Sequence, residues 1–243
     1  MTDNFQSRLD HVKEKIASAC RRCGRSFDQV SLLTVSKTFG PQDVAEAAEC
    51  GLTVFGESRI QEAKQKIPLC SGSLDWHMIG HLQRNKVKDA VQLFKMIHGV
   101  DSIRLLETIN TQSQEVGLTM PVCLEVNVSG EGSKFGMNPS EVLTVLEGAT
   151  KLMNVDVVGL MTIPPFTADP EGARPLFKTL RELRDKCSKE SGFPLEQLSM
   201  GMSHDFEVAI EEGATWIRLG SILFGERKKK ETDPLSSGDE YEE

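Results

Sequence analysis

Long apolar runs are missing from this sequence of 243 residues. No stretch approaches the roughly 18 apolar residues that a membrane-spanning helix needs. The opening segment, Met1-Thr2-Asp3-Asn4, also lacks the basic stretch followed by an apolar one that marks a secretory signal. We therefore expect a cytoplasmic protein that has no membrane partner.

An excess of positive charge is missing too. The formal net charge is −8, and residues 231–243 contain six of the acidic residues and no basic one. Residues 1–230 therefore carry 30 acidic against 28 basic residues, a net charge of −2. A nearly neutral body offers no basic face for nucleic acid, so no nucleic-acid partner is expected.

A second cysteine pair of the CxxC type is also missing. Cys20 and Cys23 have the spacing of a metal or redox pair, but a zinc site of this type needs a further pair. Both cysteines continue an apolar helical stripe that includes Leu9, Val12 and Ile16. We expect them to lie on a buried helix face as reduced thiols, and we predict no metal site.

Strand-like and helix-like patterns alternate along the chain after an amphipathic helical pattern at 4–24. Strands are predicted at 31–36, 52–55, 75–79, 94–98, 121–128, 155–160, 196–200 and 215–219. Helices are predicted between them at 41–50, 58–66, 83–92, 102–116, 139–150, 170–190 and 204–212. This order predicts an α/β fold, a single (β/α)8 barrel of the TIM type. An open doubly wound sheet is the rival, but the GxGxxG turn typical of it is absent.

The composition changes near the carboxyl end of the chain. Residues 1–227 are predicted to form one barrel domain with an extra N-terminal helix. Residues 228–243 begin with three lysines and continue with Ser, Asp, Glu, Gly and Pro without apolar periodicity. We predict a disordered charged tail there.

Lys37 is the most informative single residue. It follows the short apolar and β-branched run 31–36, and Pro41 comes four residues later, which predicts a buried strand that ends in a sharp turn. Active groups of such barrels gather at the carboxyl ends of the strands. Burial favours the neutral form of a lysine amine, which attacks carbonyl carbons. The alternative is a loop lysine that extends into solvent.

The last two strand ends predict a phosphate site. Ser203 precedes the predicted helix at 204–212, where a capping hydroxyl and free backbone amides are expected. Gly220 and Ser221 follow the eighth strand. The loops after the seventh and eighth strands form the usual phosphate site of these barrels. Separately, Ser203 could be only a helix cap and Gly220 only a tight turn.

Other polar residues receive structural predictions. His77 and His81 flank the end of the third strand, but the sequence positions no third metal ligand, so packing or hydrogen-bonding roles are expected. Glu57 and Glu62 are predicted to be surface or capping groups. Lys134 lies in a glycine-containing loop without the GxxxxGK[ST] order, so we predict a solvated lysine, with a second amine near the site as the alternative.

Seven segments of the chain resemble those of the pyridoxal phosphate homeostasis protein family, whose barrel is similar to the N-terminal barrel of alanine racemase. The segments occur in order between about residues 5 and 227: TVSK (34–37), FGESRIQE (55–62), WHMIGHLQRNK (76–86), SKFG (133–136), GLMT (159–162), GMSHD (201–205) and RLGSILFG (218–225). Ser58 and Ser221 depart from the asparagine and the threonine that many family members have. The departure at Ser58 puts any side-chain contact from that position in doubt.

The resemblance implies a role for each matching position. Lys37 matches the lysine that forms a Schiff base with pyridoxal 5'-phosphate. Ser203, Gly220 and Ser221 match the phosphate-binding positions, with Met202 contributing through its backbone. Arg218 matches the arginine that faces the pyridine nitrogen.

These roles imply a carrier of pyridoxal 5'-phosphate that serves vitamin B6 homeostasis and delivers the cofactor to acceptor apoenzymes. An arginine has only donors and cannot accept a hydrogen bond from a protonated pyridine nitrogen, so this nitrogen stays largely unprotonated. The ring is then a weak electron sink, and no catalytic residue is predicted. The alternatives are an amino-acid racemase, a lysine-dependent aldolase, or a regulatory module that uses the tail. Barrel racemases use a catalytic tyrosine, whereas the one tyrosine here is Tyr241 in the tail.

Overall fold

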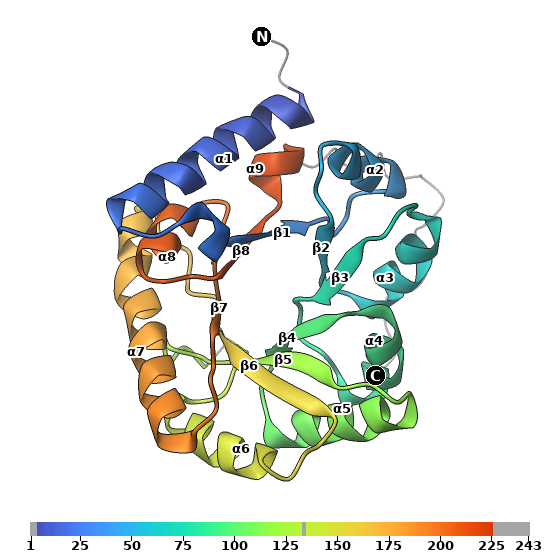
Figure 1. Cartoon of the computed structure of the whole chain (residues 1–243), viewed down its shortest axis with the longest axis vertical. Helices are drawn as coiled ribbons and strands as arrows, with labels where there is room; N and C mark the ends of the chain where they lie inside the picture. Colours follow the sequence, from blue (N-terminus) through green and yellow to red (C-terminus); the bar gives the residue numbers. More distant parts are fainter. Residues whose placement is uncertain (1–3, 133–134, 226–243) are drawn as a thin grey trace.

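The computed structural model describes residues 4–132 and 135–225, and its eight parallel strands close into a barrel (Figure 1). Each strand pairs with the next, and β8 pairs in parallel with β1, with Ser31 opposite Trp216 and Thr34 opposite Leu219. The strands are β1 (Ser31–Val35), β2 (Val54–Glu57), β3 (Asp75–Met78), β4 (Met96–Val100), β5 (Met120–Glu125), β6 (Val155–Met161), β7 (Gln197–Met202) and β8 (Trp216–Leu219). The predicted eight-stranded barrel is therefore confirmed.

Helices surround the barrel (Figure 1). They are α1 (Phe5–Arg22), α2 (Pro41–Glu49), α3 (Ile60–Lys66), α4 (Val87–Leu93), α5 (Ile103–Glu115), α6 (Val142–Ala149), α7 (Arg174–Ser191), α8 (Phe206–Glu211) and α9 (Ser221–Phe224). Short 3-10 turns lie at Phe27–Gln29, Ile67–Leu69, Arg84–Lys86, Pro139–Glu141 and Pro170–Ala173. All helices but α9 were predicted, and α9 has only four residues, too few to produce a helical periodicity.

The strands bury both of their faces, which explains their nearly continuous apolar runs. Outward side chains pack with the helices into one large core, whereas Leu33, Val35 and Ile79 form a separate cluster inside the barrel. Successive side chains of a strand point to opposite faces. Because Leu33 and Val35 point inward, the same alternation directs Lys37 inward and Ser36 toward the helices.

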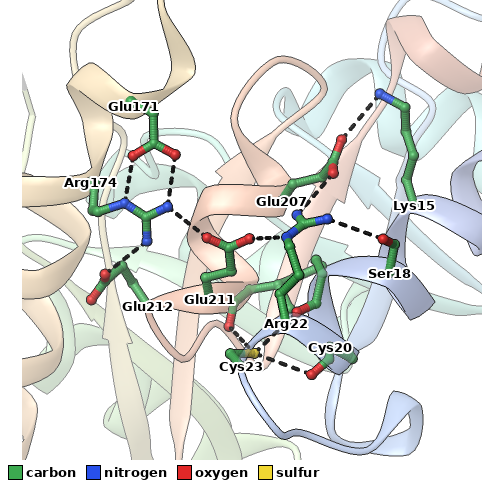
Figure 2. Close-up of polar contacts among 12 residues, drawn as sticks. Lys15, Ser18, Cys20, Arg22, Cys23, Glu171, Arg174, Glu207, Glu211 and Glu212 are labelled. Carbon is green, nitrogen blue, oxygen red and sulfur yellow. Dashed lines mark hydrogen bonds and ion pairs between the residues drawn. The ribbon is translucent and has the colours of Figure 1, made fainter.

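Helix α1 packs along α8 and α9 on the outside of the barrel. Its apolar stripe is buried down to Cys20, which confirms the predicted helix-face role of that cysteine. Cys23 differs from the prediction, because it is the C-cap residue just after the helix and is half-buried. Figure 2 shows the polar side of this junction, where Arg22 reaches Glu207 and Glu211 of α8. Glu211 also binds Arg174 at the start of α7, so one network joins three helices.

Several sequence predictions fall outside the described residues. They concern Lys134 and the tail at 228–243 with Tyr241. Within the described part of the chain, no helix combines the length and the apolar character needed to cross a membrane.

Candidate functional site

A cavity of about 420 Å³ opens at the carboxyl ends of the strands. It is lined by residues from β1, β7 and β8 and the loops that follow them, together with residues after β2, β3 and β6, among them Ser58 and Gly80. All six predicted cofactor-binding residues line this one cavity: Lys37, Met202, Ser203, Arg218, Gly220 and Ser221. Residues separated by about 180 positions in the chain are thus brought together because β8 closes the barrel against β1.

Lys37 lies in a tight turn directly after β1. The carbonyl oxygen of Ser36 accepts the N–H of Phe39 at 3.0 Å, so Lys37 and Thr38 are the two central residues of a β-turn. Thr38 has a φ of +73°, which gives the turn the character of type II. Lys37 is half-buried, so it is less enclosed than the sequence predicts.

Ser203 ties the loops after β7 and β8 together. Its Oγ accepts the N–H groups of Gly220 at 3.3 Å and Ile222 at 3.4 Å. Because this oxygen accepts from two amides, its own O–H remains to donate. The predicted role as a helix cap is wrong, since α8 begins at Phe206 and its N-cap residue is Asp205.

Asp205 holds the backbone of Met202. Its Oδ1 accepts the Met202 N–H at 2.7 Å, and the carbonyl of Met202 accepts the Asp205 N–H at 3.1 Å. Burial raises the pKa of Asp205, and the bond to Met202 acts in the opposite direction. The backbone contribution of Met202 to a bound ligand stays a prediction.

Arg218 is a buried guanidinium on the inner face of β8, with 4% of its surface exposed. It donates to Ser199 Oγ at 2.7 Å and to the Thr162 carbonyl at 2.9 Å, two bonds that fix its plane. Burial lowers the pKa of Arg218 to about 10, so the group keeps its charge at neutral pH. Buried Glu125 faces this charge, and its own burial raises its pKa to about 7.

Two histidines extend the network across the barrel. His98 Nδ1 lies 2.7 Å from Ser199 Oγ, and His98 Nε2 lies 3.0 Å from His77 Nδ1. Burial lowers the pKa of His77 to about 4, and that of His98 falls as well, so both rings are neutral at physiological pH. His77 therefore has the predicted hydrogen-bonding role. His98, Ser199 and Glu125 were missed, although polar residues at inward positions of apolar strands are a usable signal.

Two residues after β3, His81 and Gly80, differ in their relation to the cavity. His81 does not line it: its Nδ1 lies 3.2 Å from Asp101, and its ring stacks on Phe135 with centroids 4.2 Å apart. Gly80 is required where it stands, because a Cβ there would lie 2.3 Å from the Ser58 carbonyl oxygen. The described residues contain no group of three metal-ligating side chains.

The prediction for Glu57 and Glu62 is wrong. Glu57 is fully buried at the end of β2, and Glu62 is half-buried on α3. Both bind the ammonium group of Lys66, a residue that the sequence did not single out. The three charges form a buried cluster on the helix side of β1 and β2.

Comparison with known proteins shows the family of this chain. The protein-family model described as the alanine racemase N-terminal domain matches residues 7–228. The pyridoxal phosphate homeostasis protein of Aquifex aeolicus is 46% identical over 226 residues, which cover 93% of this chain and 99% of that protein. The chain belongs to the pyridoxal phosphate homeostasis protein family.

Solved structures extend the comparison to the fold. PipY of Synechococcus elongatus, solved with PLP bound, is 35% identical with a TM-score of 0.79, and the match covers 88% of this chain and all of PipY. Alanine racemase from Clostridium difficile is 16% identical with a TM-score of 0.72 and shares the fold alone. The match covers 94% of this family member but 58% of the racemase, which is a much longer chain.

Proposed function

We propose that this protein binds pyridoxal 5'-phosphate through Lys37 and holds it for vitamin B6 homeostasis and for delivery to apoenzymes. One observation carries the proposal: a lysine amine, a serine O–H with backbone amides, and a buried guanidinium all line a single cavity. The name of the Aquifex relative and the bound PLP in PipY support the same ligand.

The residues fit the chemistry of this ligand. When bound, pyridoxal 5'-phosphate supplies an aldehyde that an amine condenses with and a ring that can withdraw electrons. Lys37 offers the amine, and the Ser203 hydroxyl with the loop of Gly220 and Ser221 offers hydrogen-bond donors to the phosphate. Gly220 brings its backbone close to β1, since a Cβ there would lie 3.1 Å from the Val35 carbonyl oxygen.

We also propose that the protein stores the cofactor and catalyses no turnover with it. The Arg218 guanidinium has only donors and stays charged, so a ring nitrogen beside it stays unprotonated. A neutral pyridine withdraws electrons weakly, which disfavours carbanion chemistry. His77 and His98, the neutral histidines behind Arg218, provide no strong acid to change this.

The test uses the full-length protein loaded with pyridoxal 5'-phosphate and freed of excess ligand. We expect an absorbance band near the edge of the visible range, which borohydride bleaches, and a reduced adduct that peptide mass spectrometry assigns to Lys37. Lys37→Ala should lack both signals. Lys64→Ala, which removes an exposed lysine of α3, should keep both.

Two outcomes would contradict the proposal. An adduct on another lysine, or no adduct, would overturn the assignment of Lys37. Racemisation of amino acids by the loaded protein, measured by chiral chromatography, or cleavage of a phosphorylated sugar would show that the protein is an enzyme and overturn the proposed storage role.

A further inference from the structure

The buried charge cluster on the helix side of β1 and β2 contacts the backbone beside Lys37. Lys66 is the last residue of α3, and 6% of its side chain is exposed. Its Nζ donates to Glu57 Oε1, Glu62 Oε1 and the Ser36 carbonyl oxygen, each at 2.8 Å. An ammonium group has three donors, so all of them are used. One acceptor is therefore the main-chain carbonyl that precedes Lys37.

The two carboxylates of the cluster bind the same short segment. Ser36 Oγ donates to Glu57 Oε1 at 2.6 Å, and the Thr38 N–H donates to Glu62 Oε1 at 2.5 Å. The cluster thus holds residue 36 through both its side chain and its carbonyl, and residue 38 through its amide. These residues stand immediately before and after Lys37, which faces the cavity on the other side of the strand.

The segment that is held in this way is strained. Thr38 adopts a φ of +73°, in the left-handed region that β-branched residues strongly avoid. Glycine is the usual residue at this position of a type II turn, because it reaches positive φ without steric cost. A threonine keeps such a conformation only when its surroundings hold it there. The hydrogen bond from Thr38 to Glu62 supplies a direct hold.

We propose that the cluster of Lys66, Glu57 and Glu62 positions Lys37 by holding the turn 36–39 in its strained conformation. This inference rests on the proposed function, because positioning matters only if Lys37 receives the cofactor. Lys66 is then a positioning residue that acts through the Ser36 carbonyl and the two carboxylates. Without it, the turn samples other conformations, and the apparent affinity for the cofactor falls with the fraction of molecules that keep Lys37 in place.

A second contact explains why the loss should be partial. The ring of Phe39, at the far end of the turn, stacks on Phe224 of α9 with centroids 4.5 Å apart. This stacking fixes one end of the segment independently of the cluster. We therefore expect Lys66→Met to weaken binding of pyridoxal 5'-phosphate at least tenfold without abolishing it.

The decisive test is a double-mutant cycle between positions 66 and 38. The full-length protein is freed of cofactor with hydroxylamine and titrated with pyridoxal 5'-phosphate for Lys66→Met, Thr38→Gly and the double variant. Thr38→Gly alone should change the affinity less than twofold. In the Lys66→Met background, Thr38→Gly should raise the affinity at least threefold above that of Lys66→Met alone, because glycine adopts the turn conformation without steric cost.

A matched control and a second readout separate positioning from general damage. Lys64→Met removes a lysine of the same helix whose side chain is 53% exposed and paired with Asp89, and it should show no coupling to Thr38→Gly. In the cofactor-free protein, hydrogen exchange of the Thr38 amide should be at least tenfold faster in Lys66→Met than in Lys64→Met. This second measurement needs no bound ligand.

Each outcome supports or overturns the inference. If the parent protein does not bind the cofactor at Lys37, the proposed function itself fails. If the parent binds, then unchanged affinity in Lys66→Met, or a glycine effect equal in the Lys66→Met and Lys64→Met backgrounds, overturns the positioning role. Should Lys66→Met not fold, Glu62→Gln tests the same hold at a quarter-exposed side chain, with an expected loss of about threefold and faster Thr38 exchange; unchanged values would overturn it.

Discussion

The cluster behind Lys37 and the ion-pair network under α1 contain similar groups but differ in exposure. In the cluster, the side chains of Lys66 and Glu57 are 6% and 0% exposed. In the network of Figure 2, the side chains of Arg22 and Arg174 are 46% and 32% exposed. Desolvation of the cation is therefore severe in the first region and much smaller in the second.

The two regions also differ in what their charges contact. Lys66 and Glu62 bind the main chain on either side of Lys37. Arg22 and Arg174 bind carboxylates on neighbouring helices, and their side chains stay partly in water. This cluster can define a backbone conformation because Lys66 and Glu57, at its centre, have little access to water as an alternative partner. An exposed network only favours the packing of helices that apolar contacts already hold together.

The sharpest difference should appear on removal of one cation from the buried cluster. Lys66→Met leaves Glu57 and Glu62 close together without their shared ammonium group. We expect the free energy of unfolding to fall by about 3–5 kcal/mol, as for other broken buried pairs. Urea denaturation of the cofactor-free protein measures this loss. Lys64→Met is the control and should lower the free energy of unfolding by less than about 0.5 kcal/mol. Equal losses in the two variants would show that burial does not set how much a charged lysine contributes to stability here.

Glu125 provides a buried carboxylate whose titration can be followed directly. Burial raises its pKa from 4.5 to about 7 in the folded protein, so the folded state binds more protons than the unfolded state between these values. Stability from this group is complete below about pH 4.5 and is lost as the pH rises to about 7.

Glu125→Gln should remove this pH dependence. Relative to the parent, its free energy of unfolding should rise by about 3 kcal/mol between pH 4 and pH 8, from the shift in pKa. Denaturant titrations at several pH values measure the difference, with exposed Glu147→Gln as the control. A flat difference would mean that folding does not shift the pKa of Glu125.

The sequence predicted the fold better than it predicted the partners of charged groups. Each strand and most helices have their own periodicity, so they could be recognised separately. The burial of Glu57 depends on its ion pair with Lys66, the last residue of the next helix, α3. No local pattern contains such a pairing. Because Glu57 follows the predicted strand 52–55, the sequence indicates a surface or capping group near the start of the next helix, whereas Glu57 ends β2.

In the candidate site, too, the positions of residues could be predicted better than their contacts. The positions of Lys37 and Arg218 in the cavity could be predicted because strand ends converge at one rim of a barrel and because the segments around them resemble a known family. Ser203 was predicted in the site but with the wrong contacts, since its two amide partners belong to the loop after β8. The role of Thr38 could not be predicted, because its positive φ depends on the bond to Glu62.

Within the exposed network, Arg174 should have the largest effect. Its guanidinium binds Glu211 at 2.6 Å and Glu212 at 3.1 Å, and both carboxylates are less than one-fifth exposed. We expect Arg174→Met to lower the free energy of unfolding by about 1 kcal/mol at low salt, and by less at about 0.5 M salt, where screening is stronger. A loss that is large and independent of salt would place Arg174 with the buried cluster.

The smallest effect is expected at the most exposed pair. Lys178 and Glu182 lie one helical turn apart on α7, 56% and 63% exposed, with 3.8 Å between Nζ and Oε1. The lysine precedes the glutamate, which is the less favourable order for such pairs along a helix. Methionine and lysine have similar helix propensities, so Lys178→Met isolates the ion pair. We expect a loss of about 0.3 kcal/mol or less at low salt and none at about 0.5 M salt, measured by urea denaturation. A loss of about 1 kcal/mol would mean that a factor other than solvent exposure sets the strength of charge pairs in this protein. The difference in stability between the buried cluster and the exposed network would then need another cause.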